Sequence, residues 1–377
     1  MELLTPAPAR PIAAPAPVAP PQVWVLLGYG AGGNDQLLRL ARALGWPFEA
    51  KRLRYNMLNY CPNPLLGASA ATIDRHRSDR LAAPWPDLVI AASRRAAPVA
   101  RWIRRQSGGR TRLVHLLHAQ APLHHFDLVV TMPQYRLPER PNVLHHLLPL
   151  NVPEPEALRA AAAEWELRLA GLPRPWIAVL VGGDSSTYRM SSAVAARLGA
   201  EASAAARAAG GSLLVTTSPR TPPAAAASLV GAIDAPAHVY LWHEQRGSEN
   251  PYRAYLALAE RFIVTADSAS QLAEACSTGR PIELYDWPQR RRLMRRCLAP
   301  LARLPGMARL HAAAVAGGFV KPRRDFEACH EALRARGLLG GGQARDGPRA
   351  VPDELAQTVA RVHRLMGEPP VRTGAHA

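Results

Sequence analysis

The chain has 377 residues, and its 46 Lys and Arg residues outnumber its 29 Asp and Glu residues to give a formal net charge of +17. A hydrophobic content of 48% excludes a wholly disordered chain, and the length predicts two domains. Only Lys51 and Lys321 are lysines, which leaves 44 arginines. Because this usage accompanies abundant Ala and Pro, we attribute much of the charge to composition. We expect phosphorylated ligands or an acidic membrane surface, and no nucleic acid, as partners.

The sequence contains no pattern typical of a membrane span, a signal peptide or a disulfide framework. No apolar run reaches the roughly 18 residues that a spanning helix needs. Residues 1–21 alternate Ala and Pro and predict a disordered tail. The four cysteines, Cys61, Cys276, Cys297 and Cys329, form no CxxC pair. We therefore expect a cytoplasmic protein, in solution or peripheral on the inner membrane.

From residue 22 to 150, short runs of Val, Ile and Leu alternate with stretches of helical spacing. This alternation is typical of a parallel sheet with helices on both faces. The predicted strands are Val23–Leu27, Phe48–Leu53, Asp87–Ala91, Arg112–Leu117, Asp127–Thr131 and Val143–His146, and the predicted helices are Asp35–Leu44 and Pro98–Gln106.

A second alternating series follows Pro149–Pro155, whose prolines indicate an interdomain linker. Two tandem Rossmann-like α/β domains, 22–150 and 151–340, with a cleft between them, are the simplest fold. Residues 341–377 then form a Gly-rich joint, a terminal helix near Asp353–Met366 and a tail. The predicted strands of the second series are Trp176–Val181, Ser212–Thr217, His238–Trp242, Arg261–Thr265 and Pro281–Tyr285, and its helices are Ser191–Ala209, Pro223–Ile233, Tyr252–Ala259 and Ser268–Ser277.

The loops after the second-domain strands form the main candidate site, because ligands of open parallel sheets bind at the carboxyl ends of the strands. Gly182 and Gly183 would offer N–H groups to a phosphate, Arg220 a positive charge, and a helix its positive end. Glu274, one turn after Ser270, would accept hydrogen bonds from a ribose. The residues of this predicted nucleotide-diphosphate site are Gly182, Gly183, Asp184, Arg220, Ser268, Ser270 and Glu274.

Structural roles explain some of these residues as well. Ser268 and Gln271 have the spacing of a helix-capping box, and Gly182-Gly183 suits a tight turn. The cluster His115, His118, His124 and His125 matches no metal template, and we expect no metal site.

The segment Gly28–Gly33 reads Gly-Tyr-Gly-Ala-Gly-Gly after a strand and matches the G-x-G-x-x-G fingerprint of dinucleotide-binding folds. No acidic residue ends the next strand, although Arg52 or Arg54 suits a 2′-phosphate. An NAD(P)-binding oxidoreductase therefore stays an alternative. After this loop, Asp35 would act as a general base facing the cleft or cap its own helix.

Five segments share the motifs of one known family. They are Trp85–Ile103, Phe126–Tyr135, Ala178–Asp184, Asn250–Tyr252 and Val264–Pro281. In this order they resemble the mitochondrial-fission (elongated-mitochondria) family of bacteria and plants, over roughly residues 22 to 290. The resemblance implies a glycosyltransferase-B-like architecture and a nucleotide-sugar site in the second domain. Asp267–Glu274 is similar to the donor-ribose loop and helix of the enzyme that adds N-acetylglucosamine to the peptidoglycan lipid precursor.

Two departures from the family pattern bear on catalysis. The family's first loop reads Gly-Asp-x-x-Gln, whereas this chain has Gly33-Asn34-Asp35-Gln36, and Ala266 replaces the glycine of Gly-Asp-Ser-Ala-Ser. The plant member recruits a dynamin-related protein, so a non-catalytic scaffold is a further alternative.

We expect transfer of a sugar from a nucleotide-diphosphate donor to an envelope- or lipid-linked acceptor, without metal or further cofactor and with Asp35 as base. The acceptor would lie against Gly28, Gly30, Gly33, Asn34 and Gln36. The basic segment with Arg290, Arg291, Arg292, Arg295 and Arg296 would rest on anionic lipid or form a solvated helix face.

Overall fold

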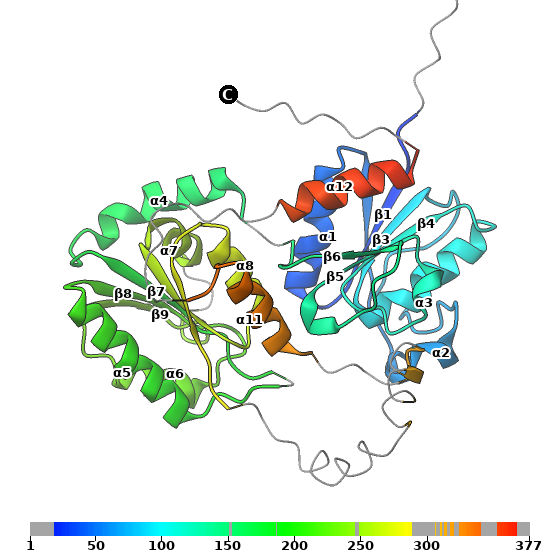
Figure 1. Ribbon diagram of the computed structural model, residues 1–377. Helices are drawn as coiled ribbons and strands as arrows, with labels where there is room; N and C mark the ends of the chain where they lie inside the picture. The colour runs from blue at the N-terminus through cyan, green and yellow to red at the C-terminus, as the bar shows by residue number, and fades with distance from the viewer. Residues whose placement is uncertain are drawn as a thin grey trace, which may run out of the picture.

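The computed structural model describes residues 19–150, 153–185, 187–245, 249–288, 324–340 and 353–367, with residues 306, 310, 313–314 and 317–319. Most of the predicted tail 1–21 and all of the basic segment Arg290–Arg296 lie outside the described residues. The remaining chain forms two α/β units, each built on one parallel sheet (Figure 1). The predicted pair of Rossmann-like domains is therefore confirmed.

Six parallel strands form the first sheet, in the order β2-β1-β3-β4-β5-β6. Its central strand β3 is wholly buried, as a sheet covered on both faces requires. Helices α1 (Ala31–Ala43) and α12 (Glu354–Leu365) pack on one face, and α3 (Ser93–Gln106) packs on the other. The strands are β1 (Val23–Leu27), β2 (Phe48–Arg52), β3 (Leu88–Ala92), β4 (Arg112–Leu116), β5 (Leu128–Thr131) and β6 (Val143–His145).

Five parallel strands form the second sheet, in the order β11-β10-β7-β8-β9. Helices α5 (Ser192–Ala208) and α6 (Pro223–Gly231) pack on one face. The other face packs against α4 (Pro155–Leu169), α7 (Tyr252–Leu258), α8 (Ala269–Cys276) and α11 (Phe326–Ala335). The strands are β7 (Trp176–Leu180), β8 (Ser212–Thr216), β9 (Ala237–Tyr240), β10 (Arg261–Thr265) and β11 (Ile282–Tyr285).

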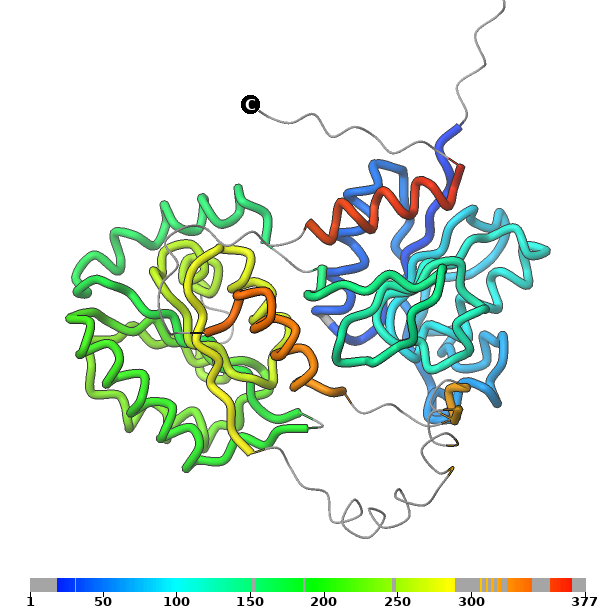
Figure 2. The backbone as a smooth tube through the Cα atoms, in the orientation of Figure 1, coloured from blue at the N-terminus to red at the C-terminus, as the bar shows by residue number. Residues whose placement is uncertain are grey.

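The terminal helix α12 packs on the first domain although it follows the second in sequence (Figure 2). Val362 is fully buried in the core that contains α1, and the ring of His363 lies 4.4 Å from the ring of Trp46. The buried Glu354 carboxylate accepts hydrogen bonds from the N–H groups of Leu147 and Leu148. Helix α12 is thereby fixed to the chain segment that leaves the first sheet.

The predicted strands all occur, with ends within two residues of those predicted. The predicted starts of two helices are wrong, because α1 begins at Ala31 and α3 at Ser93. The N–H groups of a first helical turn need no intrahelical partner, so a helix can begin within a glycine-rich segment. Among the described residues, the elements that were not predicted include α2 (Asn63–Leu66), α4, α11 and the 3₁₀ turns η1 (Met57–Tyr60), η2 (Leu123–His125) and η3 (Pro133–Tyr135).

Candidate functional site

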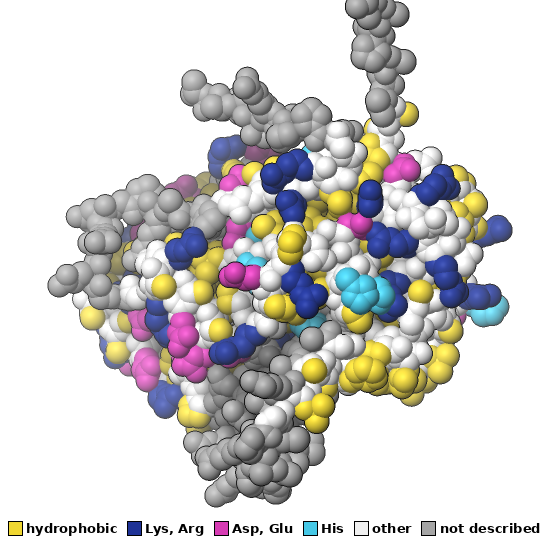
Figure 3. Space-filling model, turned by 45° about the vertical axis from the view of Figure 1, so that its right-hand side comes forward, with side chains coloured by type: hydrophobic (Ala, Val, Ile, Leu, Met, Phe, Trp, Pro, Cys, Tyr) yellow, Lys and Arg dark blue, Asp and Glu magenta, His cyan; other side chains and the backbone are white. Residues whose placement is uncertain are grey.

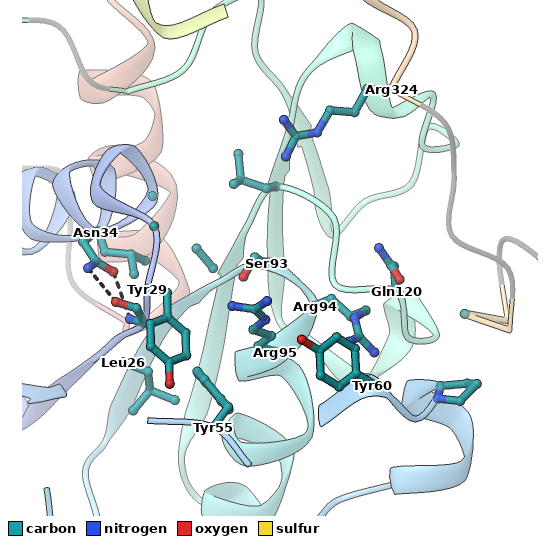
Figure 4. Close-up of a pocket in the computed structure, with 18 of the residues that line it drawn as sticks. Leu26, Tyr29, Asn34, Tyr55, Tyr60, Ser93, Arg94, Arg95, Gln120 and Arg324 are labelled. Atoms are coloured by element: carbon teal, nitrogen blue, oxygen red, sulfur yellow. Dashed lines mark hydrogen bonds between the residues drawn. The ribbon is translucent and has the colours of Figure 1, made fainter. Parts of the chain in front are cut away.

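A cavity of about 690 Å³ opens at the carboxyl ends of β1, β3 and β4 in the first domain. Its described lining holds three arginines and three tyrosines but no Asp or Glu. Arg94 and Arg95 lie side by side between the tyrosines, and Arg324 reaches in from another wall (Figure 4). The cavity also contains the predicted loop residues Gly28, Gly30, Gly33 and Asn34.

The Asn34 side chain links the two ends of the first loop, Gly28–Asn34, through hydrogen bonds. Asn34 Oδ1 accepts from the Gly28 N–H at 2.9 Å, and Asn34 Nδ2 donates to the Gly28 carbonyl at 2.9 Å. Gln36 is buried, and it donates to the Gly32 carbonyl at 3.0 Å and accepts from the Leu150 N–H at 3.3 Å. These contacts give Asn34 and Gln36 positioning roles. Asp35 is exposed on α1 and lies outside the described lining of the cavity, and it does not cap the helix, which begins at Ala31.

The cavity is electropositive. Arg94 donates from Nη1 to the Cys61 carbonyl at 2.9 Å and from Nη2 to the Asn59 carbonyl. The Arg95 guanidinium lies 5.4 Å from the ring centre of Tyr29, a cation–π distance. Burial, and then the charge of Arg95, lowers the pKa of the Arg94 guanidinium, although an arginine stays protonated at neutral pH. Among the described residues, the cavity arginines form no ion pair with a carboxylate, so their charge is available to an anion.

Ser93 joins β3 to α3 in a left-handed backbone conformation, with φ of 65°. This conformation costs free energy in a residue with a side chain, and such residues are concentrated at functional sites. Ser93 lines the cavity with Arg94 and Arg95. The strand-end rule, applied to β3, would have identified all three, but the predicted helix start at Pro98 left them in an unassigned loop.

The second-domain loops are hydrogen-bonded to one another. The Gly182 N–H donates to Thr265 Oγ1 at 2.7 Å, and the Gly183 N–H donates to Asp267 Oδ2 at 2.9 Å. The expectation that these two N–H groups are open to a phosphate is therefore wrong for this conformation. Close packing also requires glycine, because a Cβ on Gly183 would lie 2.2 Å from the Arg220 carbonyl oxygen.

An ion pair between a buried carboxylate and a partly exposed arginine lies against these glycines. Arg220 Nη1 is 2.5 Å from Asp267 Oδ2, and the Asp267 side chain is fully buried whereas that of Arg220 is 40% exposed. Burial raises the pKa of the Asp267 carboxyl, and the Arg220 charge opposes that shift. Asp184 belongs to the same network, since its N–H donates to the Arg220 carbonyl at 2.9 Å and its Oδ1 accepts from the Met190 N–H at 2.8 Å.

Helix α8 brings the remaining predicted residues to the boundary between the domains. Ser268 occupies the N-cap position without a side-chain capping bond, so the predicted capping box does not form. A Cβ built on Gly32 of α1 would lie 3.6 Å from Ser270 Oγ, so the first turns of α1 and α8 meet. The Tyr252 hydroxyl donates to Glu274 Oε2. Burial, and then the Glu274 charge, raises the pKa of that hydroxyl well above its usual range.

The described residues contain no group of three or more His, Cys, Asp or Glu residues that is arranged to hold a metal ion. None of the described helices is long and apolar enough to cross a bilayer. The predicted cluster of histidines is divided, because His115 is buried against Phe126, with ring centres 4.9 Å apart, whereas His124 is exposed.

Comparison with known proteins confirms the resemblance. The family model described as "Mitochondrial fission ELM1" matches residues 31–336. The mitochondrial fission protein ELM1 of Arabidopsis thaliana is 31% identical over 219 residues, which cover 52% of this chain and 51% of that protein. The match thus spans about half the length of the plant protein. An uncharacterized protein, RP120, of Rickettsia prowazekii is 23% identical over 70% of this chain and 82% of its own.

Among solved structures, a UDP-glucosyltransferase from Polygonum tinctorium matches with a TM-score of 0.41 and 12% identity, over 92% of this chain and 99% of that one.

Proposed function

Since this chain belongs to the mitochondrial fission ELM1 family, we propose that it transfers a sugar from a nucleotide-diphosphate donor to an envelope- or lipid-linked acceptor. The observation that carries the proposal is the meeting of α1 and α8, one from each domain, where Gly32 and Ser270 approach each other. Both helices present N-terminal ends there, and each end carries a partial positive charge. Two such ends suit the diphosphate of a donor better than any neutral ligand.

On the donor side, α8 supplies the groups that would contact the nucleotide. The Ser268 and Ser270 hydroxyls lie in its first turn, and Glu274 lies one turn later with Tyr252 bonded to it. Glu274 would accept from the ribose hydroxyls, and Tyr252 would hold its carboxylate in position. The exposed part of Arg220 would contact the diphosphate, while Gly182, Gly183 and Asp184 support the loop from inside.

On the acceptor side, the arginine-lined cavity would bind the second substrate against the Gly28–Asn34 segment. An acceptor hydroxyl oxygen attacks the anomeric carbon of the sugar, the bond from that carbon to the diphosphate breaks, and the hydroxyl proton passes to a base. Helix ends and arginines offset the charge that develops on the leaving diphosphate without requiring a metal. Asp35 is our candidate base, and its exposed place on α1 requires the acceptor to reach beyond the cavity.

Thermal unfolding against UDP-, GDP-, CMP- and dTDP-sugars tests the donor site. A donor that binds the folded state stabilises it by about 2.7 kcal/mol at a hundredfold excess over Kd. We expect one class of nucleotide-sugar to raise the unfolding temperature, and Glu274→Ala to abolish that shift. Glu331→Ala, on the exposed face of α11, is the matched control and should retain it. A shift that Glu274→Ala leaves intact would contradict the proposed site.

A nicotinamide cofactor is the second candidate, because Gly28 directly follows β1 and Gly33 lies in the first turn of α1, as in dinucleotide-binding folds. Against it, β2 ends at Arg52, and its one acid, Glu49, pairs with Lys51 at 2.5 Å. NAD(H) and NADP(H) therefore belong in the same panel. Stabilisation by these cofactors alone would replace the transferase proposal, and the absence of any shift would favour a scaffold.

A further inference from the structure

A group of exposed apolar side chains lies beside the cavity of the first domain. Within residues 57–66, Met57 is 79% exposed, Leu65 75%, Tyr60 70% and Leu58 49%. We call these four residues the apolar platform. Hydrophobic side chains gather along the lower edge of the face in Figure 3, at the level where Figure 1 places α2. Exposed apolar side chains that are grouped, rather than scattered singly, mark interaction sites.

Buried hydrogen bonds hold the platform in place. Asn63 is 1% exposed, and its Nδ2 donates to the Arg94 carbonyl at 2.9 Å and to the Ala119 carbonyl at 2.7 Å. The Arg94 carbonyl is free for this bond because Pro98, four residues later in α3, has no N–H to donate. The polar side chain is therefore inside and the apolar ones outside, which reverses the usual arrangement of a surface loop.

The cavity anchors the same segment from the other side. The Arg94 guanidinium donates to the carbonyls of Asn59 and Cys61, which flank Tyr60. Tyr60 and Pro62 line the cavity together with Arg94 and Arg95. The apolar platform is thus continuous with the electropositive cavity. A ligand with an anionic head group and an apolar chain would suit both the cavity and the apolar platform.

We infer that the apolar platform docks on an anionic membrane surface and that the cavity behind it binds the phosphate group of a lipid in that membrane. Charge complementarity with an anionic membrane supports this choice, because the described lining has three arginines and no carboxylate. Apolar side chains beside basic ones are the combination that binds an interface without spanning it. Only a role for this lipid as the sugar acceptor, through a hydroxyl group that it carries, would rest on the proposed function.

Vesicle co-sedimentation of the full chain tests the docking surface. Vesicles of phosphatidylcholine mixed with phosphatidylglycerol are compared with vesicles of phosphatidylcholine alone. We expect binding to the anionic vesicles, with a loss of about tenfold or more in the double variant Met57→Ser/Leu65→Ser. Leu167→Ser is the matched control, because Leu167 is 86% exposed on α4 of the second domain. Wild-type binding by the double variant, or no binding by the wild type, would overturn the inference.

The cavity has its own readout, which requires neither a sugar donor nor turnover. Water-soluble dihexanoyl phosphatidic acid should stabilise the wild type more than inorganic phosphate or dihexanoylglycerol does. Arg95→Gln should lose most of that difference, since Arg95 has no carboxylate partner among the described residues. Equal stabilisation by inorganic phosphate would overturn the lipid assignment. A failed sugar-transfer assay would leave both readouts unaffected, so the two proposals can fail separately.

Discussion

At the carboxyl end of β3, Arg94 and Arg95 face a cavity whose described lining has no carboxylate, whereas after β8 Arg220 forms an ion pair with the buried Asp267. The two edges belong to sheets of the same parallel construction. In the first domain the arginines of the edge face a cavity without a carboxylate partner among the described residues, and in the second Arg220 is paired with Asp267. A shared parallel α/β construction therefore does not decide which edge offers unpaired charge to a ligand.

The two edges also differ in whether packing requires a glycine. Gly183 is required by packing, because its φ is +147° and the Arg220 backbone lies against it, whereas a Cβ on Gly33 would meet nothing within 4 Å. The second edge is thus closely packed, and a donor would contact its outer groups and the first turn of α8. The carboxyl edge of the first sheet, in contrast, borders an open cavity.

Alanine at these two glycines should have opposite effects, and this is the largest contrast that we expect between two single substitutions. Gly183→Ala should lower the free energy of unfolding by about 3 kcal/mol or more, through overpacking and a strained φ. Gly33→Ala in α1 should be neutral or stabilise by up to about 1 kcal/mol, because alanine favours a helix. Urea unfolding of both variants measures the difference. Similar losses at both positions would show that the first loop is as closely packed as the second.

Acid should destabilise the first domain through three buried histidines. Burial lowers the pKa of His115 to about 3 and the pKa values of His118 and His146 to about 4. These folded-state values lie below the unfolded value of about 6.5, so the unfolded chain binds more protons at intermediate pH. Above about pH 6.5 these histidines therefore do not lower the free energy of unfolding. Below that pH the free energy of unfolding falls by about 1.4 kcal/mol per pH unit for each histidine.

Calorimetry between neutral pH and the folded-state pKa values measures this slope. His118→Gln should reduce the slope by about 1.4 kcal/mol per pH unit, the contribution of one proton. His124→Gln, at an exposed position, is the control. A slope that His118→Gln leaves unchanged would mean that this imidazole is protonated in the folded protein.

Removing an arginine should distinguish the paired edge from the unpaired one. Arg220→Ala leaves the Asp267 carboxylate buried without its partner and should cost about 1–3 kcal/mol, a range reduced by the solvent that reaches Arg220. Arg95→Ala should change stability by no more than about 0.5 kcal/mol and should weaken anion binding instead. Unfolding and ligand titration of the same two variants test both halves. A large stability loss in Arg95→Ala would reveal a structural role for that residue.

One further substitution should give a small gain in stability. Ser93→Gly should raise the free energy of unfolding by about 1 kcal/mol, because glycine adopts the left-handed conformation at φ of 65° without the cost that a Cβ brings. Thermal unfolding measures the gain. An unchanged or lower stability would mean that the Ser93 side chain makes a compensating contact.

Much of the fold could be predicted from the sequence because buried parallel strands are continuous apolar runs. Strands such as Val23–Leu27 and Arg261–Thr265 have the predicted ends. Helix starts were less predictable, since α1 begins among glycines and α3 at a serine with positive φ. For the candidate site, Ser268, Ser270 and Glu274 could be grouped by their spacing on one helix. The contact of Ser270 with the Gly32 region joins residues far apart in the chain.

The sequence by itself determined the two alternating α/β series, the family motifs and the helical face that carries Ser270 and Glu274, because these depend on residue type and on short-range periodicity. Only the tertiary structure decided that the Gly182 and Gly183 N–H groups are used internally, that Arg94 and Arg95 share a cavity, and that α12 completes the first domain. Hydrogen-bond partners and open space depend on which distant segments meet. The spacing of residues along the chain does not specify these long-range contacts, because each contact depends on the packing of the whole core.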